Sequence, residues 1–325
     1  MVYKIIIIVL KWINLTKLYI CGIIITNFKG MAMPSYKTHS IHGELIYPEI
    51  DKKTEIKKED LKSYCMGPDA MIETDYKTFN YQHANKVREF FTTILKYIKE
   101  NKLQDNGEVM AYLYGNIDHL VLDALTHPLI YYMTEDIERQ HKIRPHGLVE
   151  HWIDDYTVQK YDRNKMLYYY KWFITNNDLM KLVNEVYKEV YGVNHEGLKY
   201  SFGMFSNIMY DTLARRNAVG IVPLVIKIIN IGDFIYKKNL DRVLPYLNLE
   251  HNIWTNPETG EELRESFDDL WKKAIEISLE TISDVNKYLY QDKQLTNQLI
   301  LNDTSYNTKL PCKNGQSLKY VKKYR

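Results

Sequence analysis

The chain has 325 residues, of which 45% are hydrophobic, and this is enough to bury the core of one large domain or two small ones. A chain that is disordered throughout is therefore excluded. The 43 Lys and Arg residues nearly balance the 41 Asp and Glu residues, so the formal charge of +2 gives no strong field for a nucleic acid or an anionic membrane. A polyanionic substrate must instead be held by a local site.

Residues 1–32 form an apolar N-terminal stretch that lysines interrupt. No small-residue cleavage site follows it, and we do not expect a clean membrane-spanning helix. Two interpretations stay open: an anchor that associates residues 1–30 with a membrane, or an extension upstream of a start at Met31 or Met33. The three widely spaced cysteines favour a reducing compartment, so we expect a cytoplasmic protein, or a membrane-associated one if the anchor is real.

Residues 33–291 are expected to form one helical domain. Apolar residues recur at helical spacing, with little strand-like alternation, in the windows 83–101, 108–132, 146–160, 167–191, 199–216, 219–236 and 264–290. An all-α, multi-helix bundle is the economical interpretation. Over residues 292–325 the apolar pattern fades into a Lys-rich tail, which we expect to be disordered.

The stretch "YGNIDHLVLDALTHPLIYY", residues 114–132, is apolar on nearly every side but carries His119, Asp123 and His127 at intervals of four. On a helix these positions lie within about 80° of arc and about 12 Å of axis, so they form a slanted row on one face. One ion cannot reach all three side chains, whereas two ions can if the central carboxylate bridges them. Buried imidazoles and carboxylates need partners, and a metal ion is a good one.

A second row with the same spacing, His146, Glu150 and Asp154, follows in "PHGLVEHWIDDY", on a helix that Pro145 opens. A single His and Asp pair at this spacing is more often a hydrogen-bonded core pair than a ligand set. Two complete rows on successive helices instead indicate a site with histidine and carboxylate ligands, which is zinc chemistry without sulfur. Further candidate ligands lie upstream: His39, His42, Asp69 and His83.

The ordered set of candidates resembles the zinc-dependent phospholipase C family, whose superfamily also contains the single-strand nucleases. The segments "MPSYKTH", "GPDAM", "HLVLDALTHP" and "HGLVEHWID" carry the resemblance, which covers most of the chain from Met33 to about Tyr290. The segment "NIWTNPETGEELRESFDDL" is similar to the later part of the intracellular bacterial branch. The resemblance implies a phospholipase C/single-strand-nuclease-like bundle with the metal site between core helices.

The resemblance also implies a centre of two or three zinc ions. A first ion would be held by Asp69, His83, His119 and Asp123, and a second by His146 and Glu150, with His127 as a further ligand. Secreted relatives hold a third zinc with a histidine that matches His39 and with an N-terminal tryptophan, which this chain lacks. They also place a ligand histidine where this chain has Ile130. Asp154 lies outside their ligand set, and we expect it to orient a ligand histidine.

The expected activity is phosphoester hydrolysis, in which a zinc-bound hydroxide attacks the phosphorus of a phospholipid-type substrate. The resemblance makes Asp69 the candidate for the catalytic base or for a ligand that orients the water, because the family places its aspartate beside the attacking water. Two alternatives stay open: a single-strand nuclease-like hydrolase on the same fold, acting on nucleic acid, and a catalytically inactive helical binding protein that zinc stabilises. The near-neutral charge disfavours the nuclease, and no protein partner is evident.

Overall fold

The computed structural model describes residues 36–71, 75–141, 145–161, 176–194 and 241–312. Within these ranges nearly all regular structure is helical, and the strands β1 (Trp254–Thr255) and β2 (Glu262–Leu263) form a small antiparallel pair. The all-α prediction is confirmed. The predicted helices at 199–216 and 219–236, the first residues of the 167–191 window and the N-terminal stretch lie outside the described residues.

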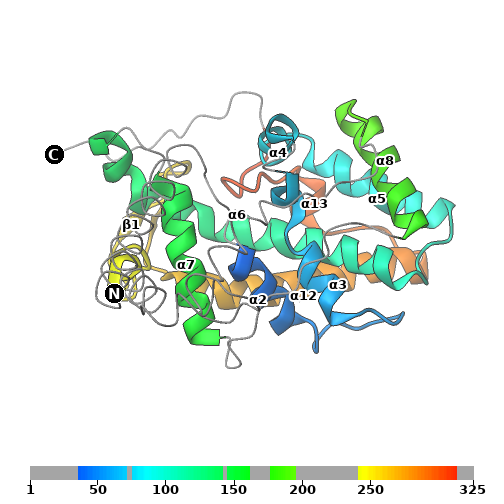
Figure 1. Cartoon of the computed structure of the whole chain (residues 1–325), viewed down its shortest axis with the longest axis horizontal. Helices are drawn as coiled ribbons and strands as arrows, with labels where there is room; N and C mark the ends of the chain where they lie inside the picture. The colour runs from blue at the N-terminus through cyan, green and yellow to red at the C-terminus, as the bar shows by residue number, and fades with distance from the viewer. Residues whose placement is uncertain (1–35, 72–74, 142–144, 162–175, 195–240, 313–325) are drawn as a thin grey trace, which may run out of the picture.

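The longest helix of the described residues, α6 (Gly107–His141), runs through the middle of the molecule (Figure 1). Every residue from Val109 to Ile130 is buried. A helix that is apolar on nearly every side must be surrounded by other elements, and α3 (Lys58–Tyr64) and α12 (Phe267–Gln291) pack along it. The polar side chains of the first row therefore lie in the core.

Short elements from the N-terminal third of the described chain complete the surroundings of α6. The helix α2 (Tyr36–Ile46) packs against α3, α6 and α7 (Pro145–Tyr161). The 3₁₀ helix η1 (Gly67–Met71) packs against α6 and against α4 (Tyr76–Gln82). These contacts bring the residues on α2, η1 and α4 next to the row on α6.

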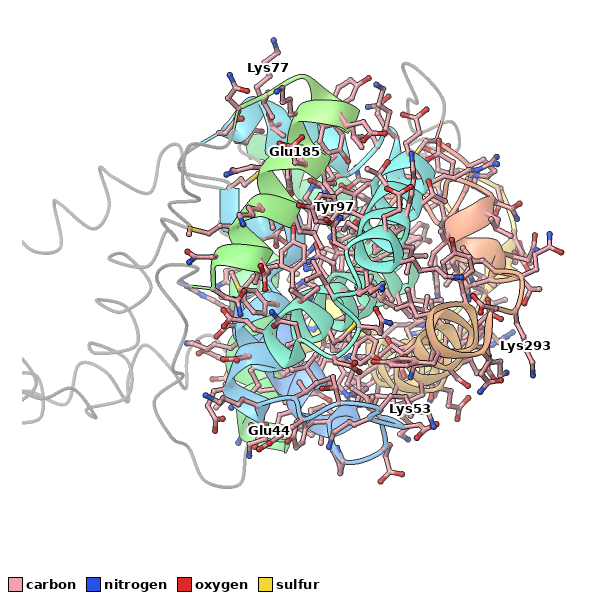
Figure 2. All side chains as sticks on the ribbon, turned by 90° about the vertical axis from the view of Figure 1, so that its right-hand side faces the viewer. Glu44, Lys53, Lys77, Tyr97, Glu185 and Lys293 are labelled. Carbon is pink, nitrogen blue, oxygen red and sulfur yellow. The ribbon has the colours of Figure 1, made fainter. Side chains whose placement is uncertain are left out.

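The remaining elements pack around the ends and sides of this arrangement. The helix α5 (Val87–Glu100) packs against α8 (Asn177–Tyr191), and the short 3₁₀ helix η2 (Leu244–Tyr246) touches α6. Viewed from the end of the molecule, α8 and α12 lie on opposite sides, with charged side chains such as Lys77, Lys293 and Lys53 at the periphery (Figure 2). Among the described residues no helix combines the length and the apolar character needed to cross a membrane.

Local sequence explains where the longer helices start and stop. Ser266 caps α12, because its side chain accepts a hydrogen bond from the Asp269 N–H while the Asp269 carboxylate accepts one from the Ser266 N–H. Gly192 ends α8 with φ at 70°, a left-handed conformation that glycine adopts without steric cost. The helical windows located the long helices, whereas α2, α3 and α4 are too short to show a clear period.

Residues 292–312 are packed, although the sequence pattern fades there. They include the helix α13 (Gln298–Leu301), which lies against α5, and the fully buried side chains of Ile300 and Tyr306. Because few apolar residues anchor this part of the chain, its periodicity is too weak to read from the sequence. The packed structure therefore continues beyond residue 291.

Candidate metal centre

Five side chains from four segments meet in the core around the first half of the row on α6. His39 comes from α2, Asp69 from η1, His83 from the C-terminal end of α4, and His119 and Asp123 from α6. None of the five residues is more than 6% exposed. Long-range packing thus brings together candidate ligands that the sequence places in separate motifs.

The carboxylate of Asp123 lies at the centre of the histidines. Its Oδ2 is 3.1 Å from Nε2 of His119 and 3.8 Å from Nε2 of His83. Its Oδ1 is 3.2 Å from Nε2 of His39 and 3.8 Å from Nε2 of His127. Each oxygen of one carboxylate therefore faces a different pair of histidines, which is the arrangement that a bridging carboxylate requires.

Asp69 lies beside the histidines on the Oδ2 side of Asp123. Its Oδ1 is 3.1 Å from Nε2 of His83 and 3.8 Å from Nε2 of His119. Within the described part of the chain, two groups of three residues have potential ligand atoms within 4.8 Å of one another: His39, Asp69 and His119, and His83, His119 and Asp123. His39 thus lies among these ligands, and its ring stacks on His119 with 4.1 Å between the centroids.

The second row on α7 contributes to the other end of the site. Glu150 Oε1 is 3.0 Å from Nε2 of His127, which joins the two rows. His146 is the second residue of α7, and its side chain lies outside the described part. Asp154 is directed to the start of α2, where its Oδ1 accepts hydrogen bonds from the N–H and the hydroxyl of Thr38, both at 2.8 Å. Asp154 therefore fixes the main chain directly before His39.

Main-chain carbonyls set the orientation of three imidazole rings. Nδ1 lies 2.8 Å from the Phe79 carbonyl in His83, 2.9 Å from the Cys65 carbonyl in His119, and 3.0 Å from the Tyr306 carbonyl in His127. A carbonyl oxygen can only accept, so Nδ1 carries the proton in each ring. In the neutral ring the lone pair is then on Nε2, which points to the carboxylates, as in histidines that bind metals.

The carboxylates and the buried imidazoles shift one another's pKa values. Burial opposes the charged form of His119, but Asp123 and Asp69 outweigh it and raise the pKa of His119 to about 9. For His127, burial is likewise outweighed by Asp123 and Glu150, and the pKa rises to about 9. Burial alone would raise the pKa of Asp123, yet His119 and His127 hold it well below its usual range. The centre therefore favours positive charge beside Asp123.

A divalent cation fits this centre better than protons do. Nε2 of His119 is buried and has no hydrogen-bond partner among the described residues, although it lies close to two carboxylates. A cation between nitrogen and oxygen ligands would satisfy this atom and would neutralise the carboxylates without protonating the rings. The donors are imidazole nitrogens and carboxylate oxygens without thiolates, a set that suits zinc.

A second buried cluster supports the centre from the side of α12. His42 does not reach the carboxylates of the centre; its Nδ1 is 2.7 Å from Oδ1 of Asp118. The Ser278 hydroxyl of α12 donates to the same oxygen at 2.8 Å. Asp118 precedes His119 in the chain, and His42 lies one turn after His39. This cluster thus ties α2, α6 and α12 together next to two candidate ligands.

Comparison with known proteins agrees with the geometry. The family model described as zinc dependent phospholipase C matches residues 38–196. This part of the chain is therefore similar to the zinc-dependent phospholipase C family. The matched range contains every candidate ligand from His39 to Glu150. Neither the curated proteins nor the solved structures gave a match.

The match with the zinc-dependent phospholipase C family supports a zinc-dependent phosphoester hydrolase at a coarse level. The histidine and aspartate groups of the centre could bind the metal. The residues that hold each ion, the number of ions and the substrate are finer questions. The location of the protein in the cell stays a prediction.

The groups that position the imidazole rings cannot be identified from the sequence. The carbonyls of Cys65, Phe79 and Tyr306 belong to the main chain, so their residue types carry no information about this role. Cys65, whose carbonyl orients His119, has a fully buried side chain. Tyr306 lies in the part of the chain whose pattern had faded, which is why its contact with the centre was missed.

Proposed function

We propose that this protein, which is similar over residues 38–196 to the zinc-dependent phospholipase C family, is a phosphodiesterase that hydrolyses a phospholipid-type substrate at a centre of two zinc ions. The observation that carries the proposal is the position of Asp123, whose two oxygens face the Nε2 atoms of different histidine pairs. A carboxylate in this position can bridge two ions.

The proposed ligands follow the two sides of Asp123. On the Oδ2 side, Asp69, His83 and His119 would hold one ion, since their ligand atoms lie close together there. On the Oδ1 side, the second ion would be held by His39, His127, Glu150 and, from the start of α7, His146. We count His39 with the second ion because its Nε2 faces Oδ1.

Zinc, when bound, supplies Lewis acidity that polarises a phosphoryl oxygen and lowers the pKa of a coordinated water. The chain's own contribution is to orient the ligands and to hold a proton. We assign Asp69 as the group that accepts the proton of the attacking water, because its Oδ1 lies 3.1 Å from Nε2 of His83 and 3.8 Å from Nε2 of His119, beside the proposed ion. The carbonyl contacts of His119 and His127 keep Nε2 directed at the centre during this step.

The choice of substrate rests on charge. A single phosphodiester needs only a local cationic centre, and the proposed zinc ions supply one. A long nucleic acid would need a basic groove along its backbone, for which the formal charge of +2 gives little support. We therefore favour a phospholipid head group over a nucleic acid strand.

The test measures zinc and activity on the same full-length protein. Zinc per chain is measured by elemental analysis, and hydrolysis is followed on phosphatidylcholine vesicles and on single-stranded DNA. The informative variant is Asp69→Asn, and the matched control is Asp51→Asn, whose carboxylate is 69% exposed on the surface. We expect about two zincs in all three proteins, and a loss of vesicle hydrolysis by 100-fold or more only in Asp69→Asn, in line with about 10²–10⁴-fold for general base catalysis.

Each other outcome rejects a stated part of the proposal. Absence of zinc in the wild-type protein would reject the metal centre. Zinc with no hydrolysis of either substrate would favour the inactive, zinc-stabilised binding protein. Hydrolysis of DNA alone would favour the nuclease, and full activity in Asp69→Asn would remove that residue from the mechanism.

A further inference from the structure

A loop near the C-terminal end of the described chain lies against the metal centre. We name residues Asp303–Cys312 the C-terminal strap. The two ends of the strap are joined by main-chain contacts, since the Ser305 N–H donates to the Leu310 carbonyl at 2.8 Å and Thr304 pairs with Pro311. Asp303 connects the strap to α5, because its Oδ1 accepts a hydrogen bond from the Arg88 N–H at 2.8 Å. In Figure 1 this orange-red segment lies beside α13 and α4.

The strap contacts His83 through the main chain. The His83 carbonyl accepts two hydrogen bonds from the strap, from the Tyr306 N–H and from the Ser305 hydroxyl, each at 3.0 Å. His83 is the residue at which α4 ends. These two bonds therefore hold the end of α4 in place and, with it, the ring that faces Asp69 and Asp123.

The strap also contacts His127 and the ring of His119. The Tyr306 carbonyl accepts the bond from His127 Nδ1 at 3.0 Å. The fully buried ring of Tyr306 lies 5.2 Å from the ring of His83 and 5.6 Å from that of His119, measured between centroids. One residue of the strap thus touches three of the candidate ligands.

We infer that the C-terminal strap is a positioning segment of the metal centre, which tightens zinc binding by fixing the orientation of His83 and His127. The inference rests on the proposed function, because it presumes that these histidines bind zinc. It adds a part of the chain beyond the family match, which ends at residue 196. Removing groups that orient metal-binding histidines costs about 10–100-fold in metal affinity.

The experiment compares the zinc dissociation constants of full-length variants, measured by competition with a fluorescent chelator. Ser305→Ala removes one bond to the His83 carbonyl, and the double variant Ser305→Ala/Tyr306→Ala also removes the ring. The matched control is Lys309→Gly, an exposed strap residue whose φ of 60° suits glycine. We expect the dissociation constant to rise about 10–100-fold in the double variant, about threefold or more in Ser305→Ala, and less than twofold in the control.

A second readout separates positioning from general stability. The unfolding midpoint of each variant is measured in excess chelator and again in excess zinc. A positioning role predicts that the increase in midpoint on adding zinc is smaller in both Ser305 variants than in the wild type. If the midpoint in chelator falls while the zinc dissociation constant stays at the wild-type value, the strap only stabilises the fold and the inference is wrong.

The remaining outcomes distinguish a failure of the inference about the strap from a failure of the proposed function. No zinc binding by the wild-type chain would reject the proposed function, whatever the variants do. Zinc binding by the wild type with unchanged dissociation constants in both Ser305 variants would reject the inference and leave the function standing. If the double variant loses its helical circular dichroism and is therefore unfolded, the zinc dissociation constant of Ser305→Ala alone tests the inference.

Discussion

Replacing Gly67 with alanine should disturb the fold and the metal centre together. Gly67 has φ at 51°, a conformation that costs an L-residue about 1–2 kcal/mol. A Cβ at this position would also lie 2.6 Å from Cγ and 2.8 Å from Cδ2 of His119, far inside the ordinary contact distance. The His119 ring has little room to move, because it is fully buried, bonded to the Cys65 carbonyl and stacked on His39.

The expected magnitude is the sum of a backbone and a packing cost. Overpacking a tight core costs about 1–3 kcal/mol, so Gly67→Ala should lower the free energy of unfolding by about 2–5 kcal/mol. If the fold survives, the His119 ring must move away, and zinc affinity should fall by about 10-fold or more. Gly192→Ala is the matched control, because Gly192 has φ at 70° but no atom of the described residues lies within 4 Å of an added Cβ.

The assay is urea unfolding in excess chelator, followed by chelator competition for zinc affinity. Gly192→Ala should show the backbone cost alone, about 1–2 kcal/mol, with zinc affinity unchanged. The reasoning is refuted if Gly67→Ala is no less stable than Gly192→Ala and binds zinc as the wild type does. That result would mean that a Cβ added at position 67 does not clash with the His119 ring.

Three further outcomes are expected. His119→Ala and Glu150→Ala should each reduce zinc per chain in elemental analysis, and an unchanged zinc content in either would remove that residue from the ligand set. Asp118→Ala leaves His42 and Ser278 buried without their shared acceptor, so it should lower the free energy of unfolding in urea by about 3–5 kcal/mol. Ser278→Ala should lower it by only about 1 kcal/mol. Equal losses of stability in the two variants would contradict the central role of Asp118. Ser266→Ala removes the cap of α12 and should lower the unfolding free energy by about 1 kcal/mol with zinc content unchanged, and a loss of zinc would show that α12 is coupled to the centre.

The rows on α6 and α7 show what a sequence can predict about this site. Helical periodicity fixes which residues share a face, so the common orientation of His119, Asp123 and His127 follows from spacing alone. The apolar surroundings of that face predicted burial, and Asp123 and His127 are buried with His119. Spacing could not predict which side chain of another element fills the space beside each residue.

The parts that could not be predicted depend on long-range packing. His39 and His42 lie three residues apart on α2, yet one faces Asp123 and the other faces Asp118. Their residue types are identical, and only the packing of α2 against α6 separates their roles. The role of the C-terminal strap is even harder to predict from the sequence, because its contacts with the centre come mainly from its main chain.

The contact between Tyr306 and the centre has a consequence for the order of assembly during synthesis. His39 emerges from the ribosome long before Tyr306, and the centre has its oriented form only when both have joined α6. Contacts this distant in sequence form late, because the intervening chain must first lose much of its freedom. A nascent chain that ends before Tyr306 can present most of the ligands but cannot fix His127, so the complete centre is a feature of the finished protein.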